Sequence, residues 1–240
     1  MPPRPSASWF IAGTDTDIGK TLIATALLHA LAANGVRAAG MKPVASGAQW
    51  RDDAWHNDDV GRLCAASSVS VPSAWMNPYL MREATAPHLA AAAEGKYIDI
   101  AHILHCHAQV SAMADVVVVE GVGGFAVPLN DEVDTADLAQ ALALPVILVV
   151  GLRLGCINHA VLTAQAIAAR GLPLAGWVAN VIDADLAHMD GTLHTLATRL
   201  PAPLLGCVPR LSVPTAAAAA AHIDFSSLAA WPAGVFSPLF

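Results

Sequence analysis

Short runs of apolar residues alternate along the chain with longer segments in which apolar side chains recur at helical spacing. The short runs predict strands at residues 9–12, 37–41, 116–119, 146–150, 176–180 and 204–208. Several consist of uninterrupted Val, Leu and Ile, as is typical of parallel strands buried on both faces. Strands that alternate with helices indicate β-α-β units. We therefore expect an α/β fold with a parallel sheet flanked by helices on both faces.

The helical spacing predicts helices at residues 21–34, 98–113 and 158–170. The first ends before Gly35 and the last before Gly171, which favour helix termination. The alanine run at 216–221 has a high helix propensity. Because no repeat or linker divides the chain, we expect a single domain over 1–240. The residues at about 229–240 are interpreted as an added C-terminal tail.

The composition of the chain indicates which partners and which cellular location to expect. Apolar residues make up 55% of the 240 residues and charged residues 13%, enough for a large core. A formal net charge of −7 disfavours nucleic-acid binding, because such binding relies on clustered Lys and Arg. The first residues lack the apolar stretch of a signal peptide, and no run approaches the roughly 20 residues that cross a bilayer. Four dispersed cysteines indicate reduced thiols. We expect a soluble cytoplasmic protein without nucleic-acid or membrane partners.

A phosphate-binding motif lies between the first predicted strand and helix. Residues 13–21 read Gly-Thr-Asp-Thr-Asp-Ile-Gly-Lys-Thr. Glycines let backbone N–H groups turn toward phosphate oxygens, and the helix N-terminus adds its positive dipole. Lys20 is placed to reach the β- and γ-phosphates of ATP and Thr21 to ligate Mg²⁺. Five residues, instead of four, separate Gly13 from Gly19, so the loop is a variant.

Carboxylates suitable for Mg²⁺ follow. Glu120 ends a run of four valines, at the edge of the sheet where ligands of open α/β folds bind. A solvated strand end is the alternative for Glu120. The four acids Asp52, Asp53, Asp58 and Asp59 fit a solvated loop better, and spacing alone selects none of them.

Six ordered blocks give the chain a resemblance to the dethiobiotin synthetases, and the resemblance covers nearly the whole length. The blocks are residues 13–21, Lys-Pro-Val-Ala-Ser-Gly at 42–47, Asn-Pro-Tyr at 77–79, Val-Glu-Gly-Val-Gly-Gly at 119–124, Leu-Gly-Cys-Ile-Asn-His-Ala at 154–160 and Gly-Trp-Val-Ala-Asn at 176–180. The unusual loop spacing is also the family's. Asp17 stands where glutamate is also found, and Val122 and Phe125 replace expected Ala and Trp.

The resemblance implies a P-loop NTPase-like fold and an ATP- and Mg²⁺-dependent ligase. In this reaction 7,8-diaminononanoate and CO₂ form a carbamate, whose oxygen attacks the γ-phosphate. The second amine then closes the ureido ring of dethiobiotin and displaces phosphate from the mixed anhydride. ADP is the other product. The protein must hold two anions together, which requires fixed positive charge.

The resemblance also implies roles for individual residues. Lys42, one of only three lysines, would face the carbamate, while Lys20 and Thr16 act on the reacting groups and Ser46 binds substrate. The implied metal ligands are Thr21, Asp59 and Glu120. The implied ATP contacts are Asp17, Ile18, Gly19, Lys20, Thr21, Leu22, Glu120, Gly121, Val122, Gly123, Asn180, Val181, Pro209, Arg210 and Leu211. Gly155, Cys156, Ile157 and Asn158 would bind the substrate carboxylate across a homodimer interface.

Two other functions remain as alternatives. A P-loop switch of the partitioning type is disfavoured because Asp15 stands where such proteins carry a second lysine. Another ligase of the same fold would differ at the block 42–47. A zinc site at His102, His105, Cys106 and His107 is also disfavoured, because position 107 points away from the others on a helix. We expect a helix surface with one buried thiol there.

Overall fold

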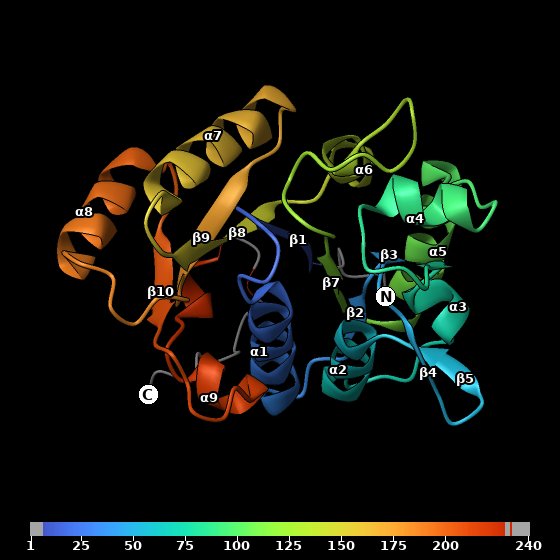
Figure 1. Ribbon diagram of the computed structural model, residues 1–240. Helices are drawn as coiled ribbons and strands as arrows, with labels where there is room; N and C mark the ends of the chain where they lie inside the picture. The colour runs from blue at the N-terminus through green and yellow to red at the C-terminus, as the bar shows by residue number, and fades with distance from the viewer. Residues whose placement is uncertain (1–6, 229–230, 232–240) are drawn as a thin grey trace.

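Six parallel strands form the central sheet, in the spatial order β10-β9-β8-β1-β7-β2 (Figure 1). The computed structural model describes residues 7–228 and 231. Each of the six predicted strands is present, with bounds that differ by at most two residues. The strands are β1(Ala7–Gly13), β2(Ala38–Met41), β7(Val116–Glu120), β8(Val146–Leu152), β9(Leu174–Val181) and β10(Leu204–Val208).

Helices cover both faces of the sheet, which confirms the predicted fold class (Figure 1). Alternate residues of β1 separate the two cores: Trp9 and Ile11 pack on one face, Phe10 and Ala12 on the other. The first face is covered by α1(Lys20–Ala33), α2(Asp58–Ala66) and α9(Ala216–Ala220). The second is covered by α5(Ile100–Met113), α6(Thr135–Leu142), α7(Cys156–Ala169) and α8(Met189–Arg199).

Residues between β2 and α5 form a smaller layer that the hydrophobic pattern did not predict. Besides α2, which also covers the sheet, its elements are α3(Ser73–Met76), α4(Pro87–Ala93), the paired short strands β3(Val44–Ala45) and β6(Tyr79–Leu80), and the hairpin of β4(Gln49–Arg51) with β5(Ala54–His56). A 3-10 turn, η1(Phe225–Ser227), lies near the other end of the described chain. The small layer stands beside the carboxyl ends of β2 and β7 and so borders the site.

Two helices end at the glycines that the sequence indicated. Gly35 and Gly171 both adopt positive φ after α1 and α7, as predicted for helix termination. The predicted tail at about 229–240 lies outside the described residues except for Trp231, whose ring stacks on Phe225. No described helix combines the length and apolarity needed to cross a membrane.

Strand register brings the predicted phosphate loop and Glu120 together. Ile11 of β1 lies beside Glu120 of β7, and Met41 of β2 lies beside Val119. The residues that follow β1 and β2 therefore leave the sheet at the same edge as Glu120. Ligands of open α/β sheets bind at this carboxyl edge.

Candidate active site

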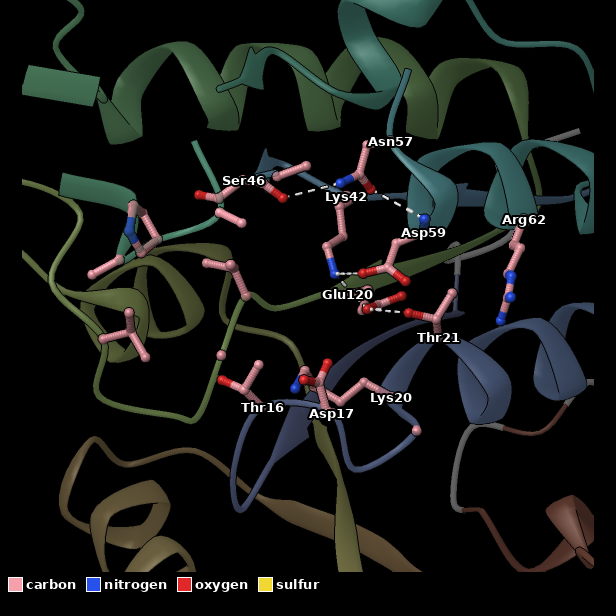
Figure 2. Close-up of a pocket in the computed structure, with 18 of the residues that line it drawn as sticks. Thr16, Asp17, Lys20, Thr21, Lys42, Ser46, Asn57, Asp59, Arg62 and Glu120 are labelled. Atoms are coloured by element: carbon pink, nitrogen blue, oxygen red, sulfur yellow. Dashed lines mark hydrogen bonds and ion pairs between the residues drawn. The ribbon is translucent and has the colours of Figure 1, made fainter. Parts of the chain in front are cut away.

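A pocket of about 750 Å³ opens at the carboxyl edge of β1, β2 and β7. One wall is the phosphate loop and the start of α1, and a second contains Lys42, Ser46 and the first turn of α2. Small and apolar residues from the segment 84–87 and from the loop after β7 close the remaining side. Figure 2 shows that the charged side chains from these separate elements point into the same space.

Gly19 is fixed by its surroundings in the phosphate loop. It adopts φ +90 at the N-cap of α1, and a Cβ there would lie 2.3 Å from the Asn180 amide nitrogen. That amide donates a hydrogen bond of 2.8 Å to the carbonyl of Ile18. Any side chain at position 19 would therefore combine backbone strain with a clash. Asn180 thus anchors the loop to the end of β9.

Lys20 lies within the loop and its ammonium donates to the carbonyl of Asp15 at 2.8 Å. Burial and the charge of Lys42 lower the pKa of Lys20 to about 8. Burial deprives the Lys20 ammonium of hydration, so an anion that binds beside it stabilises its charged form. Lys20 is therefore suited to bind phosphate oxygens.

Lys42 forms the centre of a buried cluster with the two predicted metal carboxylates (Figure 2). Its Nζ lies 2.5 Å from Glu120 Oε1 and 3.0 Å from Asp59 Oδ2. The Thr21 hydroxyl donates to the same Glu120 oxygen at 2.8 Å. Lys42 and Glu120 are 3% and 1% exposed, so their charges are shielded from water. Four predicted residues from four different elements are thus in direct contact or share a partner.

The cluster keeps its charges through mutual compensation. Burial lowers the pKa of Lys42, but the Glu120 and Asp59 carboxylates outweigh it and raise that pKa overall. Burial raises the pKa of Asp59, whereas the Lys42 cation lowers it overall. Lys42 is therefore a cation and Asp59 an anion at neutral pH.

Two asparagines hold the cluster in position. Asn77 donates to the Lys42 carbonyl at 2.6 Å, which gives a structural reason for the Asn-Pro-Tyr block. Asn57 caps α2 by accepting from the backbone N–H of Asp59 at 3.1 Å. The Asn57 amide also donates to the Ser46 carbonyl at 3.1 Å. The loop that carries Ser46 and the helix that carries Asp59 are thereby tied together.

The oxygen groups around Glu120 fit a magnesium ion chemically. Glu120 Oε2 is buried and has no hydrogen-bond partner among the described residues. A buried unpaired carboxylate oxygen is costly unless a cation or water satisfies it. Thr21 and Asp59 add two more hard oxygen donors beside it, the ligand type that Mg²⁺ prefers.

Most predicted residues of the nucleotide and substrate sites line this pocket. They are Thr16, Asp17, Gly19, Lys20, Thr21, Leu22, Lys42, Ser46, Asp59, Glu120, Val122 and Gly123. The Ser46 hydroxyl is buried without a partner among the described residues, so it is available to a ligand. Ile18 is itself buried, and Gly121 packs against Phe10 beneath the pocket.

Two predicted groups do not reach the pocket lining. Asn180 and Val181, at the end of β9, and Pro209, Arg210 and Leu211, after β10, lie outside it. Arg210 joins the two segments through a 3.0 Å hydrogen bond to the Ile182 carbonyl. Gly155 is the N-cap of α7, with φ 93, and Cys156, Ile157 and Asn158 form its first turn, two residues before the predicted helix start. They too lie outside the lining formed by this chain.

Sequence reasoning missed several residues of the pocket. Asn57 could have been found from its position before two aspartates, because Asn followed by acids is a helix N-cap signal. Arg62 lies one turn after Asp59 on α2, and no chemical signal distinguishes it. Ala84, Thr85, Ala86 and Pro87 reach the pocket only through the fold of the small layer. On α5, Cys106 is buried while His102 and His105 are exposed, as the helix-surface interpretation predicted.

Comparisons with known proteins identify relatives over nearly the whole chain. A family model described as an AAA domain matches residues 7–218. The ATP-dependent dethiobiotin synthetase BioD of Janthinobacterium sp. (strain Marseille) is 60% identical over 93% of this chain and 96% of its own length. The protein of the same name from Aromatoleum aromaticum (strain DSM 19018 / LMG 30748 / EbN1) is 57% identical over 85% of this chain and 91% of its own.

Solved structures with low sequence identity share the fold. A ParA family ATPase from Chlorobium tepidum TLS superposes with a TM-score of 0.54 at 11% identity, covering 86% of both chains. The MinC:MinD complex of Aquifex aeolicus gives a TM-score of 0.53 at 14% identity, covering 86% of this chain and 82% of that chain. These likenesses concern architecture alone. Identity of 57–60% over 85–93% of the chain to the two curated relatives places this chain in the ATP-dependent dethiobiotin synthetase family.

Proposed function

We propose that this chain is an ATP-dependent dethiobiotin synthetase, which joins 7,8-diaminononanoate and CO₂ into a cyclic urea while converting ATP to ADP and phosphate. The observation that carries the proposal is the contact of Lys42 with Glu120 and Asp59 beside Lys20 and Thr21. It puts two cations and an oxygen-rich cation site in one pocket, as the meeting of two anions requires. The relatives at 57–60% identity support the same activity.

The proposed roles follow from position and charge. Lys20, Thr16 and the backbone of residues 17–22 bind the ATP phosphates at the N-terminus of α1. Lys42 faces the carbamate, and Ser46, which lines the same pocket, binds substrate. Pairing by two carboxylates keeps Lys42 charged, and burial increases the strength of its interaction with an anion.

The reaction needs no covalent group from the protein. One amine of the substrate attacks CO₂ and loses a proton to give the carbamate. The carbamate oxygen attacks the γ-phosphorus of ATP and ADP leaves. The second amine attacks the carbamoyl carbon, phosphate leaves with the bridging oxygen, and the five-membered ring closes. The chain contributes by holding the anions at reacting distance and compensating their charge.

Thr21, Asp59 and Glu120 would hold Mg²⁺, together with water and the nucleotide. When bound, the ion would supply positive charge to the phosphates. Glu120 Oε2, which has no partner in the described part of the chain, and the oxygens of Thr21 and Asp59 support this assignment.

The remaining contacts are proposed for the ends of the substrates. Asn180, Val181 and the residues 209–211, tied to one another through Arg210 and Ile182, would contact the adenine. The start of α7 would bind the substrate carboxylate in the pocket of a second copy within a homodimer. Leu154 and Leu162, which are 91% and 56% exposed, are apolar side chains at this helix that the interface would cover.

A direct assay tests the function. Purified protein is mixed with Mg²⁺, ATP, bicarbonate and the diamine, and the cyclic urea is sought by mass spectrometry. Omission of any one component should abolish the product. ATP hydrolysis that is independent of the diamine, without a cyclic urea, would contradict the proposal and favour an ATPase switch.

A further inference from the structure

The phosphate loop carries two acidic residues, Asp15 and Asp17, although it must receive a triphosphate. A carboxylate near phosphate oxygens repels them, and this repulsion is stronger at the edge of a protein than in bulk water. Asp15 is also the position at which partitioning ATPases carry a lysine. The negative charge of Asp15 therefore has to be compensated by another part of the chain before ATP can bind tightly.

Arg153 supplies that compensation. Its guanidinium Nη2 forms an ion pair with Asp15 Oδ2 across 138 positions of sequence. The other carboxylate oxygen of Asp15 accepts from the backbone N–H of Thr16 at 2.8 Å. The Asp15 carbonyl accepts from the Lys20 ammonium at 2.8 Å. Asp15 thus links Arg153 to two residues that we propose to act on ATP.

Arg153 comes from the connection between β8 and α7. It directly follows Leu152, the last residue of β8, and its carbonyl accepts from the backbone N–H of Cys156 at 3.0 Å. The same short connection leads into the helix start proposed for the substrate carboxylate. One ion pair therefore joins the nucleotide loop to the segment proposed for the other substrate.

We propose that Arg153 is a positioning residue for ATP: it neutralises Asp15 and holds the loop in the conformation that presents Thr16 and Lys20. The inference rests on the proposed binding of ATP at this loop. It does not depend on which molecule is phosphorylated. The pair is made by one guanidinium nitrogen and one Asp15 oxygen, which leaves the other Asp15 oxygen to accept from the Thr16 N–H.

If the Arg153–Asp15 pair served only to stabilise the fold, its loss would lower the melting temperature and not the ATP affinity. The side chains of Arg153 and Asp15 are 42% and 40% exposed, and ion pairs with this exposure contribute about 0–1 kcal/mol to folding. Loss of the pair should therefore leave thermal unfolding almost unchanged. Loss of charge compensation should instead appear in ATP affinity.

The test uses the full chain with Mg²⁺ and measures ATP affinity by calorimetry. In Arg153→Gln, Asp15 is left as an uncompensated charge, and the Kd for ATP should rise about tenfold, equivalent to 1.4 kcal/mol. Arg153→Lys should recover part of this loss. The double variant Asp15→Asn/Arg153→Gln lacks the unpaired charge and should bind ATP more tightly than Arg153→Gln.

The matched control is Arg170→Gln. Arg170 caps the other end of α7 and pairs with Asp134 and Asp137, away from the pocket. It should lose a comparable ion pair without a change in ATP affinity. In steady state, Arg153→Gln should raise the KM for ATP and keep most of kcat at saturating ATP.

Two results would overturn the inference. One is wild-type ATP affinity in Arg153→Gln. The other is a double variant that binds ATP as weakly as the single variant, which would exclude charge compensation. If wild-type protein bound ATP but made no dethiobiotin, the proposed activity would fail while the calorimetric comparison would still decide the role of Arg153.

Discussion

Lys42 and Lys20 carry like charges in one pocket but have different partners. The Lys20 ammonium bonds to a carbonyl of the phosphate loop, whereas Lys42 bonds to two carboxylates. Lys20 is thus open to exchange its carbonyl for phosphate oxygens. Lys42 is held in place before any ligand binds, as expected of a group that stabilises developing charge.

The two lysines should therefore fail in different ways when replaced. Lys20→Gln should weaken ATP binding, because its partner is the nucleotide. Lys42→Gln should largely retain ATP affinity and lose about 10²–10³ in the rate of ring formation. Calorimetry with ATP and product formation at saturating diamine and bicarbonate check this pair. If the two variants lost equal ATP affinity, or if Lys42→Gln formed product at the wild-type rate, the assignment of Lys42 to the carbamate would be wrong.

Lys42→Gln has a second consequence, since it leaves Glu120 and Asp59 without their cation. Removal of one partner from a buried ion pair costs on the order of 3 kcal/mol, and the exposure of Asp59 reduces this value. We predict that Mg²⁺ raises the melting temperature of Lys42→Gln more than that of the wild-type protein. The control is Lys42→Gln/Glu120→Gln, which should lose the extra stabilisation. Equal magnesium effects in all three proteins would argue against a metal at these carboxylates.

Sequence could predict these residues singly but not their contacts. Lys20, Thr21 and Glu120 were found from the loop motif and a strand end. The bond from Thr21 to Glu120 spans 99 positions and depends on the pairing of β1 with β7. Spacing alone does not select Asp59 among four acids; the family resemblance does, and in the structure its contact with Lys42 distinguishes it.

At the scale of elements, the small layer between β2 and α5 determines the shape of the pocket. Its segment 84–87 lines one side, and Glu94 ties the two ends of the segment 82–96 together. Glu94 Oε1 accepts from the backbone N–H of Arg82 at 2.6 Å, and its other oxygen lies 2.8 Å from the Lys96 ammonium. Glu94 is the C-cap residue of α4, directly after Ala93.

Low pH should weaken the contacts that Glu94 makes within the segment 82–96. The N–H of Arg82 and the Lys96 ammonium lower the pKa of Glu94 to about 2, so its contribution to stability is present above the ordinary pKa and is lost as pH falls toward 2. We expect Glu94→Gln to lower stability by about 1 kcal/mol at neutral pH, after allowance for solvent screening. The difference from wild type should shrink as pH is lowered from about 5. Urea unfolding at several pH values measures it, and a difference that grows with acid would contradict the assignment.

The hydrophobic pattern predicted the elements of the sheet and missed those of the small layer. Strands such as β7 and β8 are buried on both faces, so their apolar runs are unambiguous. By contrast β4 and β5 consist of three exposed residues each, and α3 has only four residues. Segments this short have no period to recognise, and their structure depends on contacts with the rest of the chain.

At the scale of the whole molecule, one chain assembles the nucleotide pocket but leaves the start of α7 outside its lining. The proposed homodimer would bring that helix start to a neighbouring pocket. Leu154, just before the helix start, and Leu162, within α7, are exposed apolar side chains that such an interface would bury.

Replacement of these leucines should separate the copies. Leu154→Glu/Leu162→Glu should sediment as a monomer and lose turnover, with ATP affinity retained because the nucleotide site is within one chain. Tyr97→Glu alters another exposed apolar residue, 63% exposed before α5, and should remain dimeric and active. A wild-type protein that is fully active as a monomer would contradict the proposed assembly.

The central claim is that ATP drives ring closure by phosphorylating a carbamate in this pocket. Bicarbonate labelled with heavy-isotope oxygen tests it most directly, with rapid quenching before the label exchanges with water. If the carbamate oxygen attacks the γ-phosphorus and phosphate leaves from carbon, one labelled oxygen must appear in each phosphate released. Mass spectrometry should find labelled phosphate and labelled dethiobiotin in equal amounts. Unlabelled phosphate from the same reaction would show that water attacks ATP and would contradict the account.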